Sequence, residues 1–359
     1  MNNGYNDQQN GYEYKEPINF DIVNHNERER RETRLKLEQE KRNFSKIGLG
    51  YALFSIITLT VSLIISITVL HISPDLYSSA LFRNALTPIC LYLFALPILL
   101  LVISGSKATP PEKKKMSLKK WLTIFIVSYG VMYIGSFIGN YVMAYLSALM
   151  NYDYSNALTS VISEESLWIT SIFTVVVAPI GEEFVFRKLI IDRTQKYGPV
   201  VSIMLSALMF GLMHGNFYQF FYCFALGIIL GYIYYSTGRL SLCIALHATI
   251  NFFGGILTTL LQSTLTELAG FDSSSESLLN FVSNNVIGII ALIAWIILMI
   301  SSLVCAIVVP IVFRKQIKLS RGSNQLPRGH VFNTVIINSG MLFMFITYFA
   351  EFGLNLLPL

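Results

Sequence analysis

The stretch Gly181-Glu182-Glu183-Phe184-Val185-Phe186-Arg187 decides how this chain is interpreted, because it places three charged side chains within an apolar segment. The residues just before it, Leu167 to Ile180, carry no charge. Ionisable groups at membrane depth are costly, so the few that occur there are usually paired and functional. The stretch therefore predicts a membrane helix that carries a polar site.

The composition indicates an integral membrane protein. Hydrophobic residues make up 53% of the 359 residues and charged residues only 13%, and the mean hydropathy is +0.57. Soluble domains carry about 25% charged residues. The net charge of +5 comes from basic residues beside apolar runs, which favours cytoplasmic loops over a surface that binds nucleic acid. The cysteines lie in apolar segments without metal-ligand spacing, so we expect them to be small core residues: Cys90, Cys223, Cys243 and Cys305.

Apolar runs of spanning length predict an all-α fold, a polytopic bundle of about eight or nine transmembrane helices over residues 47–359. Residues 1–46 are polar, and we expect a cytoplasmic, partly disordered segment that is not a cleavable signal peptide. Pro88, Pro97 and Pro179 are expected to kink or break their helices. Nine spans fit the runs best: 47–71, 85–104, 121–148, 167–190, 199–216, 217–236, 240–262, 286–313 and 330–350.

Charges in the loops predict the orientation of the chain. Residues 105–120 and 314–328 are rich in Lys and Arg, whereas residues 151–166 and 263–285 contain acidic residues but no Lys or Arg. The positive-inside rule then places the N-terminus in the cytoplasm and the C-terminus outside, with every loop in phase. The Asn-rich and Ile-rich composition is typical of a low-GC bacterium, so the expected location is a bacterial plasma membrane.

The two adjacent carboxylates are expected to do different work. Consecutive helical residues point about 100° apart, so Glu182 and Glu183 cannot face the same partner. Glu183 and Arg187 are four residues apart on one face and can form an ion pair. Glu182 is left without a local counter-charge, which suits a general base. The alternative is a structural ion pair with a spare glutamate. Pro179 and Gly181 weaken the helix here, and such breaks are tolerated at membrane depth where they line a water-filled cavity.

Two later spans contribute further polar side chains. His214 ends the sequence Phe210-Gly211-Leu212-Met213-His214, while His247 and Asn251 lie four apart on one helical face. A single membrane histidine often makes only an interhelical hydrogen bond. Counted from the turn near Gly198, however, Glu182 and His214 lie at the same depth. We therefore expect these groups to converge in a polar site open to the cytoplasmic side.

The motifs occur in a specific order on successive spans. They are Glu-Glu-x-x-x-Arg from Glu182, Phe-x-x-x-His from Phe210 and His-x-x-x-Asn from His247. In this order they resemble the CPBP family, also called Abi, of intramembrane proteases, which includes the type II CAAX prenyl endopeptidases. The resemblance covers about 167–255, roughly a quarter of the chain.

The resemblance implies a catalytic site of six side chains: Glu182, Glu183, Arg187, His214, His247 and Asn251. In it, Glu182 would activate the attacking water with help from His214. The two members of the third motif would stabilise the oxyanion, and the remaining members of the first motif would orient the site. Amide hydrolysis needs such a base and such donors on chemical grounds as well.

Family members are described either as metal-dependent or as glutamate proteases, so zinc is weighed as an alternative. Two histidines and one glutamate can ligate zinc with a position open for water. The alternative zinc ligands are Glu182, His214 and His247. The sequence lacks His-Glu-x-x-His and these residues come from three helices, so we favour metal-free general-base catalysis that requires no cofactor.

The function predicted from the sequence is an intramembrane endopeptidase that hydrolyses a peptide bond of a membrane-associated protein or peptide. Bacterial members of the family are linked to peptide maturation, self-immunity and regulation of surface proteins, and nothing in this sequence indicates a prenylated substrate. The alternative is a non-catalytic membrane scaffold that binds a cell-envelope enzyme or surface protein, although intact motifs favour catalysis. A proton-coupled transporter would need inverted repeats, which are not evident. Expected partners are the substrate, the lipid bilayer and a membrane or cell-envelope protein, and no nucleic acid.

Overall fold

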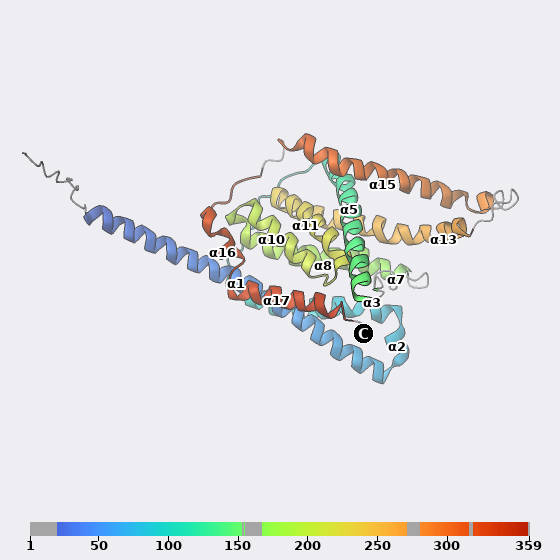
Figure 1. Ribbon diagram of the computed structural model, residues 1–359, viewed down its shortest axis with the longest axis horizontal. Helices are drawn as coiled ribbons and strands as arrows, with labels where there is room; N and C mark the ends of the chain where they lie inside the picture. The colour runs from blue at the N-terminus through green and yellow to red at the C-terminus, as the bar shows by residue number, and fades with distance from the viewer. Residues whose placement is uncertain (1–19, 153, 155–166, 271–280, 316–318, 358–359) are drawn as a thin grey trace, which may run out of the picture.

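The computed structural model describes residues 20–152, 154, 167–270, 281–315 and 319–357 (Figure 1). Within these residues the chain is helical and contains no strand. Seven helices are long and apolar enough to cross a membrane, and a bent pair, Arg328–Val335 and Ser339–Leu354, gives an eighth if it is counted as one span. The predicted all-α, polytopic membrane fold is confirmed.

The helices are interrupted by short π-helical (η1, η3, η4, η6) and 3-10 (η5, η7) segments. In chain order the elements are α1 (Phe20–Ile72), α2 (Pro74–Ser78), α3 (Ala80–Ile89), η1 (Cys90–Ala95), α4 (Leu96–Ile103), α5 (Leu118–Met150), α7 (Leu167–Ser171), η3 (Ile172–Val177), α8 (Ala178–Glu182), η4 (Glu183–Leu189), α9 (Ile190–Thr194), η5 (Gln195–Tyr197), α10 (Pro199–Leu212), α11 (Phe217–Thr237), α12 (Leu240–Asn251), η6 (Phe252–Ile256), α13 (Leu257–Ala269), α15 (Val286–Phe313), η7 (Arg328–His330), α16 (Val331–Val335) and α17 (Ser339–Leu354).

The prediction of nine full spans is wrong at 199–216. The helix there, α10, has 14 residues, which is about 21 Å at 1.5 Å per residue and short of the roughly 30 Å hydrocarbon core. The predicted last span is divided by a bend of 58°, where the backbone of Asn338 is extended and its side chain caps α17 by accepting from the Met341 backbone N–H. The polar segment before the first span continues into that span as the single helix α1 (Figure 1). Residues 1–19 of the predicted disordered segment lie outside the described residues.

The proline-containing spans adapt without ending. Pro88 lies in α3 just before η1, and Pro97 lies in the first turn of α4 just after it. Pro179 lies in the first turn of α8, between η3 and η4. π-helical turns inside α-helices occur frequently at functional sites. The expected weakening of the helices thus takes the form of widened turns.

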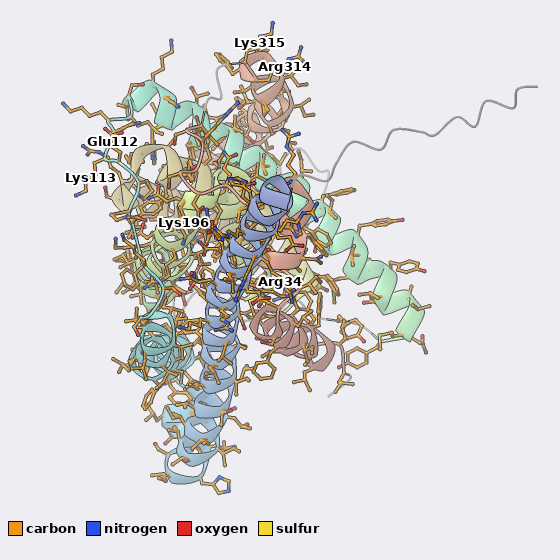
Figure 2. The ribbon with its side chains drawn as sticks, turned by 90° about the vertical axis from the view of Figure 1, so that its left-hand side faces the viewer. Arg34, Glu112, Lys113, Lys196, Arg314 and Lys315 are labelled. Atoms are coloured by element: carbon orange, nitrogen blue, oxygen red, sulfur yellow. The ribbon has the colours of Figure 1, made fainter. Side chains whose placement is uncertain are left out.

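The loops assigned to the cytoplasm by their charge contact one another. The Thr109 N–H donates to the Asp192 carbonyl at 2.6 Å, and the Lys114 N–H donates to the Thr237 carbonyl at 2.8 Å. The Asn324 N–H donates to the Lys196 carbonyl at 2.7 Å. Figure 2 shows Lys113, Lys196, Arg314 and Lys315 at this end of the molecule. The segments that the positive-inside rule groups together therefore lie on one side of the bundle.

On the opposite side of the bundle, the loop after α5, the start of α11 and the C-terminal segment are joined by tyrosine hydroxyl groups. The Tyr154 hydroxyl donates to the Leu356 carbonyl at 2.8 Å, and the Tyr218 hydroxyl donates to the Tyr154 carbonyl. The described end of the C-terminus thus lies beside the loop that follows α5.

Glycines allow the long helix α5 to approach its neighbours closely. A Cβ at Gly130 would overlap the Ser302 carbonyl of α15, and a Cβ at Gly135 would lie 2.6 Å from Cα of Tyr222 on α11. Small residues at such crossings let helix backbones pack closely in membranes, where the hydrophobic effect between helices is weak.

We expect Gly130→Ala to destabilise the protein by about 1–3 kcal/mol, because the added methyl group overpacks the α5–α15 crossing. Gly353→Ala is the matched control, since no atom lies within 4 Å of a Cβ at that position. The measurement is thermal unfolding of the detergent-solubilised protein. Equal midpoints for the two variants would contradict the close packing.

Candidate active site

Glu183 is buried between two partners from different elements. Its Oε2 lies 3.0 Å from Arg187 Nε, and its Oε1 lies 2.9 Å from His247 Nδ1. Glu183 and Arg187 have no solvent-exposed surface. The predicted ion pair on one helical face is thus present, and it also reaches α12 through His247.

The Arg187 guanidinium is positioned by an ion pair and by a cation–π contact, and not by well-aligned hydrogen bonds. Its Nε is close to Glu183, yet among the described residues neither Nε nor the two terminal nitrogens has a partner with hydrogen-bond geometry. The guanidinium carbon lies 4.3 Å from the centroid of the Phe210 ring. Such cation–π contacts are worth about 2 kcal/mol when desolvated. Phe210, from the second motif, therefore packs directly against the first motif.

The contacts of His247 determine its tautomer. Glu183, paired with Arg187, is a carboxylate and can only accept hydrogen bonds. The Nδ1 of His247 must therefore carry the proton that Glu183 accepts. The other nitrogen, Nε2, faces Glu182 at 3.8 Å from its Oε2. His247 is thus fixed in place by one carboxylate and directed toward the other.

Glu182 is the accessible member of the carboxylate pair. Its side chain is 17% exposed, whereas that of Glu183 is 0% exposed. No Lys or Arg in the described residues forms an ion pair with Glu182. This division between a neutralised and an unneutralised carboxylate is the one that the helical spacing predicts.

His214 lies in the turn between α10 and α11. Gly215 has φ +65°, a left-handed conformation that suits glycine. Asn216 caps α11 by accepting from the Gln219 N–H at 3.0 Å. The His214 ring stands edge-on to Phe210, with Nδ1 2.9 Å from the Phe210 carbonyl and Nε2 3.4 Å from the Cys223 sulfur. Phe210 thus contacts Arg187 and both histidines.

Asn251 bonds to the backbone of the first motif's helix. Its side-chain nitrogen donates to the Thr174 carbonyl at 2.8 Å. In η3 the Ala178 N–H bonds to the carbonyl of Phe173, five residues back. The next bond in that register would join residue 179 to Thr174, but residue 179 is proline and has no N–H. Asn251 therefore supplies the hydrogen bond that Pro179 cannot make.

Other π-helical carbonyls near the site receive side-chain donors from distant helices. The Tyr51 hydroxyl of α1 donates to the Val185 carbonyl at 2.5 Å, and the Ser206 hydroxyl of α10 donates to the Phe186 carbonyl at 2.7 Å. The Tyr129 hydroxyl of α5 donates to the Phe253 carbonyl of η6 at 3.3 Å. Within a membrane, every freed backbone group needs such a partner. The site is therefore supported by α1 and α5, which carry none of its motifs, as well as by α10.

Three polar side chains beside the site are not indicated by the sequence motifs. Cys223 contacts His214, and Tyr92 of η1 packs on Gly181. Glu351, on α17, lies against Gly215 and accepts from the Ser55 hydroxyl at 3.1 Å. Glu351 had a visible signal, since it is a carboxylate at the end of an apolar helix. The other two have none, because tyrosine and cysteine are ordinary in apolar helices.

Two of the alternative zinc ligands face each other, with 3.8 Å between Glu182 Oε2 and His247 Nε2. Across the described ranges, no group of three or more His, Cys, Asp and Glu side chains is placed to hold a metal ion. The His214 nitrogens face the Phe210 carbonyl and the Cys223 sulfur.

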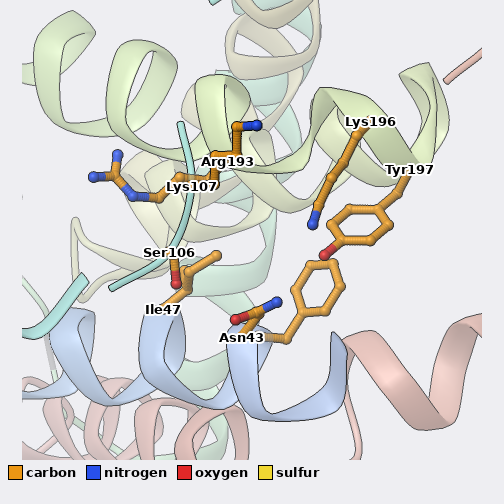
Figure 3. A pocket seen from close by; sticks show the side chains of 8 residues that line it. Asn43, Ile47, Ser106, Lys107, Arg193, Lys196 and Tyr197 are labelled. Atoms are coloured by element: carbon orange, nitrogen blue, oxygen red, sulfur yellow. The ribbon is translucent and has the colours of Figure 1, made fainter. Parts of the chain in front are cut away.

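A small cavity of about 10 Å³ lies between α1 and the end of the span that carries Glu182, at α9 and η5 (Figure 3). It has room for about one water molecule. It is lined by Asn43, Phe44, Ile47, Ser106, Lys107, Arg193, Lys196 and Tyr197. Beside it, Glu40 of α1 lies 3.2 Å from Lys196 Nζ and accepts from the Tyr197 hydroxyl. The cavity shares no residue with the carboxylate site, and these contacts join the polar part of α1 to the bundle.

One family model matches part of the chain. Residues 164–253, about a quarter of the chain, match the family model described as Type II CAAX prenyl endopeptidase Rce1-like. This confirms the family resemblance drawn from the three motifs, and the matched family is one of membrane proteases. Neither the curated proteins nor the solved structures gave a match.

We expect Asn251→Ala to destabilise the protein by about 0.6–1.7 kcal/mol, because the partly buried Thr174 carbonyl loses its interhelical donor. Adding Pro179→Ala should restore most of that loss, since residue 179 then has an N–H in register with Thr174. Thermal unfolding of the single and double variants measures this coupling.

Pro97→Ala is the control substitution, because Pro97 also lies in the first turn of a helix after a π segment. It should give no rescue of Asn251→Ala. Additive effects of Asn251→Ala and Pro179→Ala would contradict the proposed pairing.

Proposed function

We infer that this chain, which carries an Rce1-like domain over residues 164–253, is an intramembrane endopeptidase that cleaves a membrane-associated protein or peptide. The observation that carries the proposal is the difference in burial and in partners between the two carboxylates. Glu183 is fully buried and paired with Arg187, while Glu182 is accessible and faces His247. A carboxylate of the second kind can accept a proton from water.

The proposed reaction uses only side chains of the chain. Glu182 removes a proton from a water molecule as the water oxygen attacks the carbonyl carbon of the scissile peptide bond. The new C–O bond converts the carbonyl into a tetrahedral oxyanion. The proton held by Glu182 then passes to the amide nitrogen, the C–N bond breaks, and a carboxylic acid and an amine leave. Glu182 thus acts first as a general base toward water and then as a general acid toward the amide nitrogen.

His214 and His247 are proposed to support this base. His247 keeps its Nδ1 proton on Glu183 and presents Nε2 to Glu182. If His247 takes up a second proton, the Glu183 carboxylate stabilises the imidazolium. His214, in the turn before α11, is proposed to help orient the water. Asn251 has a second amide N–H besides the one bonded to Thr174, and that second N–H is its proposed contribution to the oxyanion.

The proposed location is a bacterial plasma membrane with the basic loops in the cytoplasm. The hydrogen bonds from Thr109, Lys114 and Asn324 support a common side for these loops, and their charge supports the cytoplasmic assignment. On this proposal the N-terminus is cytoplasmic and the C-terminus external.

We expect Glu182→Gln to lower cleavage by about 10²–10⁴-fold, because general-base catalysis contributes that much and the amide cannot accept the proton of water. Glu112→Gln is the matched control, since Glu112 is 79% exposed in the basic loop between α4 and α5. The substrate is identified by comparing protein termini, by mass spectrometry, in cells that express the wild type or Glu182→Gln.

At least one membrane-associated protein should lose a terminus in the Glu182→Gln cells and keep it in the Glu112→Gln cells. If Glu182→Gln gives unchanged termini and still complements a deletion strain, the chain is a scaffold and the proposal is wrong.

Metal removal tests the proposed glutamate mechanism against the zinc alternative. We expect dialysis against a chelator to leave the cleavage rate unchanged, because no step requires a Lewis acid. The rate is measured on the identified substrate before dialysis, after dialysis and after zinc is added back. Loss of activity that zinc restores would assign Glu182, His214 and His247 to a metal site.

A further inference from the structure

The tetrahedral intermediate of peptide hydrolysis needs hydrogen-bond donors directed at its oxyanion. The donors implied by the motifs are partly engaged elsewhere. Asn251 donates to the Thr174 carbonyl. His247 donates from Nδ1 to Glu183, which makes Nε2 of the neutral ring an acceptor. The site therefore has a place for a further donor.

Tyr92 packs on the residue next to Glu182 in the chain and is the candidate for that donor. It belongs to η1 in the second span, outside the residues that match the Rce1-like family. Its ring edge and hydroxyl rest directly on Gly181, where any Cβ would overlap them. Glycine at 181 therefore allows the phenol to reach the backbone beside Glu182, and this gives Gly181 a packing role.

The Tyr92 hydroxyl is available to a ligand. Within the part of the chain that the structure describes, no hydrogen bond is formed by this hydroxyl, and the side chain is only partly buried. By contrast, Tyr51 and Tyr129 donate to backbone carbonyls. A tyrosine hydroxyl in an apolar setting usually has a partner, so one held free beside a reactive carboxylate is suited to bind substrate.

We propose that Tyr92 is a further catalytic residue, whose hydroxyl donates a hydrogen bond to the carbonyl oxygen of the scissile peptide and to the oxyanion formed from it. The proposal rests on the endopeptidase function proposed above. As the water oxygen attacks, the electron pair of the C=O bond moves to the oxygen that Tyr92 faces. Tyr92 keeps its proton throughout, and Glu182 carries the proton from water to the amide nitrogen.

The test is Tyr92→Phe, which removes one oxygen atom and keeps the ring that packs on Gly181. We expect kcat to fall about 10²–10³-fold, as it does when one oxyanion donor is removed, with KM little changed. Tyr145→Phe is the matched control, because Tyr145 is 62% exposed on α5. Thermal unfolding of both variants should match that of the wild type.

Gly181→Ala gives an independent measurement. The added methyl group should displace the Tyr92 ring, so kcat should fall, and adding Tyr92→Phe to Gly181→Ala should lower it little further. Additive losses would mean that Gly181 and Tyr92 act separately, and they would overturn the proposal.

The remaining outcomes separate this inference from the proposed function. If Glu182→Gln is inactive while Tyr92→Phe keeps kcat within about twofold of Tyr145→Phe, against the 10²-fold loss expected for a donor, Tyr92 is not catalytic and the endopeptidase proposal stands. If Tyr92→Phe loses activity together with several degrees of thermal stability, Tyr92 is a packing residue. If the wild type cleaves no more than Glu182→Gln, both proposals are wrong.

Discussion

The site depends on one buried carboxylate with two partners. Glu183 has no contact with solvent and lies between Arg187, on its own helix, and His247, on α12. Removing one partner of such a buried pair costs about 3–5 kcal/mol, because the remaining charge is left uncompensated. The arrangement therefore fixes the separation of two helices and the tautomer of His247 together. It also neutralises one carboxylate of the pair, so that the adjacent Glu182 is the one left without a basic partner from Lys or Arg in the described residues.

Backbone carbonyls impose a second constraint on the same helices. A span interrupted by proline and by π-helical turns exposes carbonyls that lipid cannot satisfy. Here the Thr174, Val185 and Phe186 carbonyls are each bonded by a side chain from another helix. Asn251 and Tyr51 therefore have a structural role in addition to lying near the site. Interhelical hydrogen bonds of this kind are worth only about 0.6 kcal/mol on average in membranes, yet each one fixes a register.

The Rce1-like region is a quarter of the chain, but the site is completed from outside it. The first helix contributes Tyr51, the second span contributes Tyr92, and α17 brings Glu351 against the turn after His214. Helices outside residues 164–253 therefore pack against the candidate site, although the family match does not include them. The surrounding helices place donors and acceptors around the charged side chains of the matched region.

The sequence by itself determined the membrane class, the helical fold and the division between Glu182 and Glu183, because hydropathy and helical spacing are local properties. It also grouped the basic loops on one side, since charge beside a span is read directly from the chain. Residue counting gave α10 a full span, although its 14 residues are too few. Only the tertiary structure decided that His247 binds Glu183, that Asn251 replaces the missing N–H of Pro179, and that Tyr92 lies on Gly181. These contacts join residues tens of positions apart, and the packing of helices, which no local pattern encodes, determines which of them meet.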